Sequence, residues 1–112
     1  MRTSDGARWT LPKGGCERGE TLAQAAAREA IEEAGAIGRV NPEPIGEYRY
    51  RGDVVTAFVL AVDSTRRPAE PARDPTWFGL EAARSRLAEG GVGGPRAELE
   101  RVLLAAQRAL GK

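Results

Sequence analysis

The sequence predicts a single α+β domain over residues 1–112, and three features support this prediction. The length suits one domain with a modest core. A helix-type segment lies between residues 21 and 35, behind a glycine-rich turn. Two strand-type runs follow it at residues 45–51 and 54–62, and helix-type segments return after residue 80. Strands and helices therefore alternate along the chain, as they do in an α+β fold.

The first elements have clear start and stop signals. Residues 8–12 read as a short strand that ends at Pro12 and leads into the turn at Gly14 and Gly15. Thr21 and Gln24 have the spacing of a capping box, in which each side chain bonds the other residue's backbone. Gly35 is a natural stop for the helix that begins there.

The two strand-type runs predict a β-hairpin. Residues 45–51 alternate in character, and Gly52 and Asp53 can turn the chain into residues 54–62. The second run is apolar on both faces, so we expect it to form one strand at the centre of the sheet.

The C-terminal part predicts one short strand and two helices. Residues 64–75 form a polar connection, residues 76–79 read as a strand, and residues 80–88 read as a helix. The tract at 90–94 is a loop or a hinge. A last helix begins at Pro95 and ends at Gly111, and its apolar stripe predicts a packing role. That stripe comprises Leu99, Val102, Leu103, Ala106 and Leu110.

Composition excludes several functional classes. A formal net charge of +1 gives no support to general nucleic-acid binding. The chain has no histidine, which excludes histidine as a base or a metal ligand. One cysteine, Cys16, rules out an internal disulfide and fits a reducing compartment. No apolar run reaches transmembrane length and no signal-peptide core is visible, so we expect a cytoplasmic protein with no membrane partner.

Three carboxylates indicate a metal site. Glu29, Glu32 and Glu33 lie at i, i+3 and i+4 of the expected helix, which makes them neighbours on one face. Like charges at this spacing destabilise a helix, and Arg28 is the only base nearby. Carboxylate oxygens are the ligands that Mg²⁺ and Mn²⁺ prefer. A divalent metal site is the simplest interpretation.

The same segment resembles the Nudix box, G-x5-E-x7-R-E-U-x-E-E-x-G-U, where U is a bulky aliphatic residue. Two U positions hold Ala30 and Ala36, which we expect to loosen the packing behind the helix without removing a ligand. The flanking phrases RWTLPKGG and TWFGLEAA extend the resemblance over residues 8–88. All seven fixed letters match, at Gly14, Glu20, Arg28, Glu29, Glu32, Glu33 and Gly35.

The resemblance implies a mixed β-sheet held between α-helices, with the box on a strand–loop–helix unit. Family domains usually begin with a further strand, whereas only about seven residues precede the box strand here. We therefore expect a shortened N-terminus and an exposed sheet edge, covered by another element or by a second copy in a homodimer.

The resemblance also implies an activity, the hydrolysis of a P–O–P bridge in a nucleoside-diphosphate-linked or polyphosphate substrate. It assigns Glu32, Glu33 and the Gly14 carbonyl as ligands of Mg²⁺ or Mn²⁺, and Glu29 as a ligand or the general base. Arg28 is expected to orient the box glutamates through ion pairs. Glu20 makes a supporting contact or joins the metal shell.

Substrate-binding candidates lie outside the helix. Lys13 can hold a phosphate as a point charge, and the PKG wording around it resembles hydrolases of diadenosine or diphosphoinositol polyphosphates. Arg49 and Arg51 either extend a phosphate groove or are solvated charges. Tyr48 and Tyr50 stack a base or pack in the core. Glu70 completes the metal set or is an ordinary loop charge.

Two other interpretations remain open. One is a Nudix-like nucleotide sensor without turnover; the intact glutamates favour the enzyme over it, and the short N-terminus favours the sensor. The other is an RNA 5′-end pyrophosphohydrolase, to which the near-neutral charge gives little support.

Overall fold

A computed structural model describes residues 1, 10–50, 52–69, 71–88 and 95–110 of the chain. Within these ranges the α+β class is confirmed. No described helix has the length and apolar character that a membrane span requires. The elements in chain order are α1 (Leu22–Ala34), β1 (Ala36–Val40), β2 (Gly46–Tyr50), β3 (Asp53–Ala57), β4 (Leu60–Thr65), the 3-10 turn η1 (Pro71–Arg73), α2 (Leu80–Ala88) and α3 (Pro95–Ala109).

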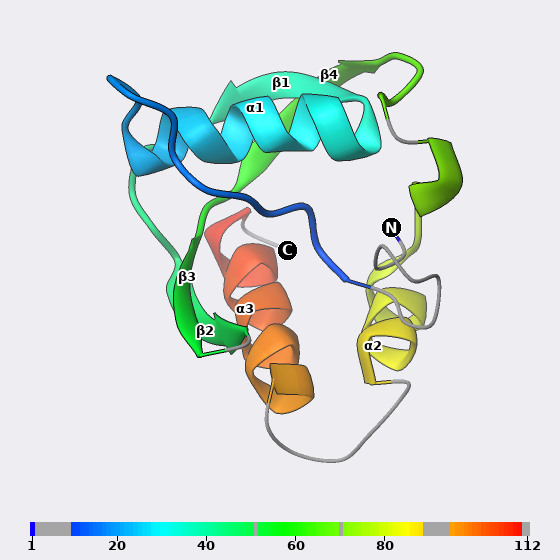
Figure 1. Cartoon of the computed structure of the whole chain (residues 1–112). Coiled ribbons are helices and arrows are strands. Elements are labelled where there is room, and N and C mark those ends of the chain that lie inside the picture. The colour runs from blue at the N-terminus through cyan, green and yellow to red at the C-terminus, as the bar shows by residue number, and fades with distance from the viewer. Residues whose placement is uncertain (2–9, 51, 70, 89–94, 111–112) are drawn as a thin grey trace.

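The strands form two antiparallel ladders, β1 with β4 and β2 with β3. Helix α1 packs on the first ladder, α3 packs on the second, and α2 packs beside α3 (Figure 1). This arrangement differs from the single mixed sheet that the resemblance implied, because both ladders among the described residues are antiparallel.

The predicted hairpin is confirmed, but the prediction for its second run is wrong. Tyr48 pairs with Val55 and Tyr50 with Asp53, so Asp53 begins β3 and does not belong to the turn as expected. The run at 54–62 is not one central strand, because it divides at residues 58–59. Its second half becomes β4 and pairs with β1, a strand that the sequence did not reveal.

The predicted signals at both ends of α1 are confirmed. The Gln24 backbone N–H donates to the Thr21 hydroxyl at 3.1 Å, and the Thr21 N–H donates to the Gln24 side chain at 2.9 Å. Gly35 ends the helix with φ of 67°, a left-handed conformation that favours glycine. A Cβ on Gly35 would also lie 1.9 Å from the Arg66 carbonyl oxygen. This position therefore requires glycine for two reasons.

The segment after β4 docks on the end of α1 through its backbone. The Arg66 N–H donates to the Gly35 carbonyl at 2.8 Å, and the Ala69 N–H donates to the Glu32 carbonyl at 2.9 Å. The last carbonyls of a helix lack partners within the helix. The docked segment supplies such partners, and it places η1 in contact with α1.

Three other expectations need correction. Residues 10–12 and 76–79 form no strand; Thr10 instead exchanges two backbone hydrogen bonds with Met1, at 2.7 and 3.1 Å. Leu110 is 53 % exposed, because α3 ends at Ala109 before the apolar stripe is complete. The remainder of the strand expected at 8–12, the tract at 90–94 and Gly111 lie outside the described residues.

The core lies between α3, α2 and the β2–β3 hairpin. Its buried side chains are Tyr48, Ala57, Leu87, Leu99 and Val102. Helix α1 adds little apolar area, because its buried residues are three alanines and Glu33. The predicted helix at 80–88 and the predicted packing role of α3 are confirmed.

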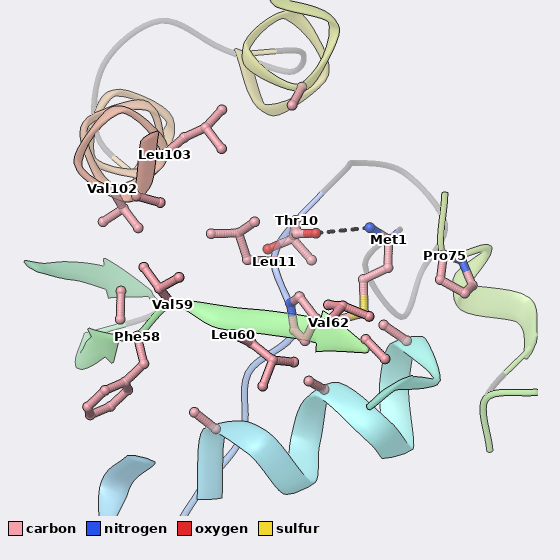
Figure 2. Close-up of a pocket in the computed structure, with 18 of the residues that line it drawn as sticks. Met1, Thr10, Leu11, Phe58, Val59, Leu60, Val62, Pro75, Val102 and Leu103 are labelled. Atoms are coloured by element: carbon pink, nitrogen blue, oxygen red, sulfur yellow. Dashed lines mark hydrogen bonds between the residues drawn. The ribbon is translucent and has the colours of Figure 1, made fainter. Parts of the chain in front are cut away.

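A cavity of about 640 Å³ adjoins this core. Residues of α1, β4 and α3 line it, together with Leu11 from the N-terminal segment. Figure 2 shows Val102 and Leu103 on one side of this space and Leu60 and Val62 of β4 on another. Ala30 and Ala36 are among its lining residues, in agreement with the expectation that small residues at these two box positions loosen the packing.

Filling this cavity should stabilise the protein. Ala106 of α3 lines it, whereas its neighbour Ala105 does not. Ala106→Leu adds buried methylene groups and should raise the free energy of unfolding by about 1 kcal/mol in urea titrations. Ala105→Leu, with the same helix propensity, should change it by less than about 0.5 kcal/mol. A loss of stability in Ala106→Leu alone would show that the cavity is closed in solution.

Candidate active site

Helix α1 places Glu29, Glu32 and Glu33 in one pocket, which Ala69 and Arg73 complete. We call these five residues the acidic pocket. The three glutamates share a helical face, as their spacing predicted. The docked segment after β4 forms the opposite wall, since η1 contacts α1. The pocket therefore joins residues that are about forty positions apart in the chain.

Arg28 connects the glutamates to the loop before the helix. Its Nη1 lies 2.7 Å from Glu29 Oε1 and 3.2 Å from Glu32 Oε2. Its Nε lies 2.8 Å from Glu20 Oε2, and its Nη2 donates to the Gly15 carbonyl at 2.8 Å. The hydrogen bond to Glu20 is the main reason why the pKa of Arg28 is raised. The ion pairs expected of Arg28 are therefore present.

Glu20 makes the supporting contact that was expected of it. Arg28 engages both of its carboxylate oxygens, at 2.8 and 3.0 Å. The Glu17 backbone N–H donates to the same carboxylate at 2.7 Å. Arg28 and this N–H lower the pKa of Glu20. These contacts favour the supporting role over a place in a metal shell.

Glu33 is the most buried of the three box carboxylates, with 7 % of the residue exposed. Its Oε2 accepts the Lys13 backbone N–H at 3.3 Å. Burial raises its pKa, because a charged carboxylate loses hydration there. The Lys13 N–H and the charge of Arg73 act in the opposite direction.

Gly14 lies directly against Glu29. A Cβ at this position would be 2.2 Å from the Glu29 carboxyl carbon. Any other residue at position 14 would displace that carboxylate or the loop. The glycine therefore brings backbone close to the glutamates, which is what the assignment of the Gly14 carbonyl as a ligand requires.

The donors of the acidic pocket suit a divalent metal. Glu29 Oε2, Glu32 Oε1 and Glu33 Oε1 make no hydrogen bond or ion pair with the described residues. One oxygen from each carboxylate is the donor type that Mg²⁺ and Mn²⁺ prefer. The described side chains are not yet gathered into a metal-holding group. Arg28 holds Glu29 and Glu32, so a metal would have to draw these two carboxylates toward Glu33.

The other predicted binding residues are dispersed. The Lys13 ammonium lies over the Tyr50 ring, 3.8 Å from its centroid. Arg49 is exposed, its backbone N–H donates to the Glu98 carboxylate, and it does not line the acidic pocket. Arg51 and Glu70 lie outside the described residues.

The structure supports the packing role for Tyr48 and not the base-stacking role. The residue is 3 % exposed and belongs to the core cluster with Leu99 and Val102. A nucleotide base cannot reach the Tyr48 ring, because the ring is buried under α3. The sequence left both roles open, because alternation along a strand does not say which face the sheet buries.

Sequence reasoning did not find Arg73 as a pocket residue. It lies in the polar connection after β4, and no sequence spacing relates it to Glu33. Only the backbone docking of that connection on α1 brings the two together.

Comparison with known proteins settles the family. The NUDIX domain family model matches residues 1–107. The chain belongs to the Nudix family. Nudix hydrolase 4 of Arabidopsis thaliana is 33 % identical over 82 residues, which are 66 % of this chain and 39 % of that protein.

Two further Nudix proteins of the same plant match shorter segments. Nudix hydrolase 13, mitochondrial, is 50 % identical over 41 residues, 37 % of this chain and 20 % of that protein. Nudix hydrolase 16, mitochondrial, is 45 % identical over 51 residues, 46 % of this chain and 28 % of that protein. The chain thus spans well under half the length of these curated relatives. The names of two of these relatives place those proteins in mitochondria. The cytoplasmic location of this chain therefore remains a prediction.

The buried tyrosine gives a testable pH dependence. Burial, with smaller effects from Glu33 and Tyr50, raises the pKa of Tyr48 from 10.0 to about 12. The neutral form of Tyr48 therefore contributes its full stabilisation, about 2–3 kcal/mol, below pH 10.0. This contribution is lost as the pH rises through about 12, because the buried ring then ionises. Ultraviolet absorbance should show one tyrosine ionising late in the folded protein. Tyr48→Phe should remove that late phase, and its persistence would contradict the burial.

Proposed function

We propose that this Nudix protein is a metal-dependent hydrolase of a P–O–P bridge in a nucleoside-diphosphate-linked or polyphosphate substrate. The observation that carries the proposal is the acidic pocket itself. Three carboxylates of one helical face share it, and each retains an oxygen without a partner among the described residues. Arg73 lines the same pocket, and a cation is what a polyanionic substrate requires beside a metal.

Glu32, Glu33 and the Gly14 carbonyl would hold Mg²⁺ or Mn²⁺, with Glu29 as a further ligand or as the general base. The metal, when bound, would supply charge stabilisation to the phosphates and lower the pKa of an attacking water. Glu29 suits either of its roles, because Gly14 lets the loop approach its carboxylate closely.

The remaining residues would orient the carboxylates and the phosphates. Arg28 keeps Glu29 and Glu32 at defined positions through its ion pairs. The Lys13 backbone contacts Glu33 and Arg73 lines the same pocket, and both side chains would contact the phosphate chain. Their charges would offset the repulsion between the carboxylates and an incoming polyphosphate.

The substrate we propose is a small dinucleoside or diphosphoinositol polyphosphate. The net charge of +1 gives no broad basic surface for nucleic acid. A homodimer remains a proposal for the protein in solution.

One observation favours a second function, that of a nucleotide sensor without turnover. Within the described ranges, Arg28 holds Glu29 and Glu32, and the three carboxylates do not form a ready metal-holding group. If a metal cannot displace these ion pairs, the protein would bind a nucleotide without activating a water.

A hydrolysis screen with and without Mg²⁺ or Mn²⁺ separates the two functions. We expect turnover of one class among dinucleoside polyphosphates, nucleotide sugars, nucleoside triphosphates and diphosphoinositol polyphosphates, lost on chelation. Glu32→Gln should lower kcat by roughly 10²-fold or more, because it removes a metal ligand. Glu32 is half exposed, so the variant should keep its fold.

Glu47→Gln is the matched control, since Glu47 is an exposed glutamate of β2 away from the acidic pocket. It should retain the rate of the original protein. Full activity in Glu32→Gln would show that Glu32 is not a ligand. Nucleotide binding without turnover of any substrate, whether or not Mg²⁺ or Mn²⁺ is present, would establish the sensor.

A further inference from the structure

Lys13 makes two contacts that join the acidic pocket to the core. Its backbone N–H donates to Glu33 Oε2 at 3.3 Å. Its ammonium lies over the Tyr50 ring, with Nζ 3.8 Å from the ring centroid. One residue therefore touches both a carboxylate of the pocket and an aromatic side chain of β2.

The Tyr50 ring packs against the core. Tyr50 is the last residue of β2 and pairs with Asp53 across the hairpin. It is partly buried and packs against the core cluster that contains Tyr48. Residues two apart in a strand point to the same face of the sheet, so Tyr50 points toward α3 as Tyr48 does. The Tyr50 ring also contacts the Lys13 ammonium.

The contact has a physical reason to matter for an anion. The face of an aromatic ring carries partial negative charge and attracts an ammonium within about 6 Å. Lysine is otherwise a flexible point charge on a long stem. An ammonium has three donors, so a ring on one side leaves donors for a phosphate on the other. Holding the side chain in advance reduces the freedom that it loses when a ligand binds.

We propose that Tyr50 is a positioning residue that holds the Lys13 ammonium beside the acidic pocket, where Lys13 binds the phosphate chain of the substrate. The phosphate contact rests on the proposed function. The contact between Lys13 and Tyr50 does not, so the two can fail separately.

The contact itself is tested by proton NMR of the full chain without substrate. Ring current from Tyr50 should shift the Lys13 ε-methylene protons upfield. Tyr50→Phe keeps the ring and should keep this shift, whereas Tyr50→Leu keeps the apolar packing and should lose it. An unshifted Lys13 in the original protein would overturn the proposal.

The role in binding is tested with inorganic tripolyphosphate and Mg²⁺ by calorimetry, which requires no turnover. Tyr50→Leu should weaken binding about two- to five-fold, the size expected for an exposed cation–π contact. Tyr50→Phe should bind like the original protein. In a Lys13→Met background, Tyr50→Leu should cause no further loss. Equal weakening by Tyr50→Phe, or a loss that persists without Lys13, would overturn the positioning role.

Kinetics then separates this proposal from the proposed function. With a substrate found in the hydrolysis screen, Tyr50→Leu should raise KM by the same factor and leave kcat unchanged. A fall in kcat instead would overturn the assignment to binding. If no substrate is turned over, the proposed activity fails, while the NMR and calorimetry still decide the role of Tyr50.

Discussion

Charge compensation around Arg28 is the interaction on which the rest of the site depends. Glu29, Glu32 and Glu33 repel one another on a single turn of α1, and α1 has no basic residue in its last turn to offset them. Arg28 gathers two of these carboxylates and also binds the Gly15 carbonyl. The same guanidinium that relieves the repulsion therefore fastens the glycine-rich loop to the helix.

The third carboxylate is stabilised differently, and this difference sets up the pocket. Glu33 is buried and receives a backbone N–H from Lys13 instead of a guanidinium. Its pKa is raised because burial removes hydration from the charged carboxylate. Burial of such a group is costly unless it is paired, and the Lys13 N–H and the charge of Arg73 offset part of that cost. Glycine at position 14 lets the loop backbone lie against the neighbouring carboxylate of Glu29.

Core and site meet along β2. Tyr48 closes the core under α3, and Tyr50 carries the contact with Lys13. The space between this core and α1 is less filled, since α1 buries alanines and residues of both line the cavity. Stability therefore comes mainly from α3 and the β2–β3 hairpin, whereas α1 mainly carries the chemistry. Capping hydrogen bonds, ion pairs and backbone docking hold α1 in place more than buried apolar area does.

The sequence by itself determined the local features. The box spacing placed three glutamates on one face, Thr21 and Gln24 began α1, Gly35 ended it, and the apolar stripe marked α3. Such signals act within a few residues and do not depend on partners distant in the chain. Only the tertiary structure decided that residues 54–62 divide between two ladders, that Tyr48 is buried and that Arg73 enters the acidic pocket. Each of these depends on partners distant in the chain, such as β1 for β4 and the carbonyls of α1 for residues 66–69, and no short-range pattern records which partner is chosen.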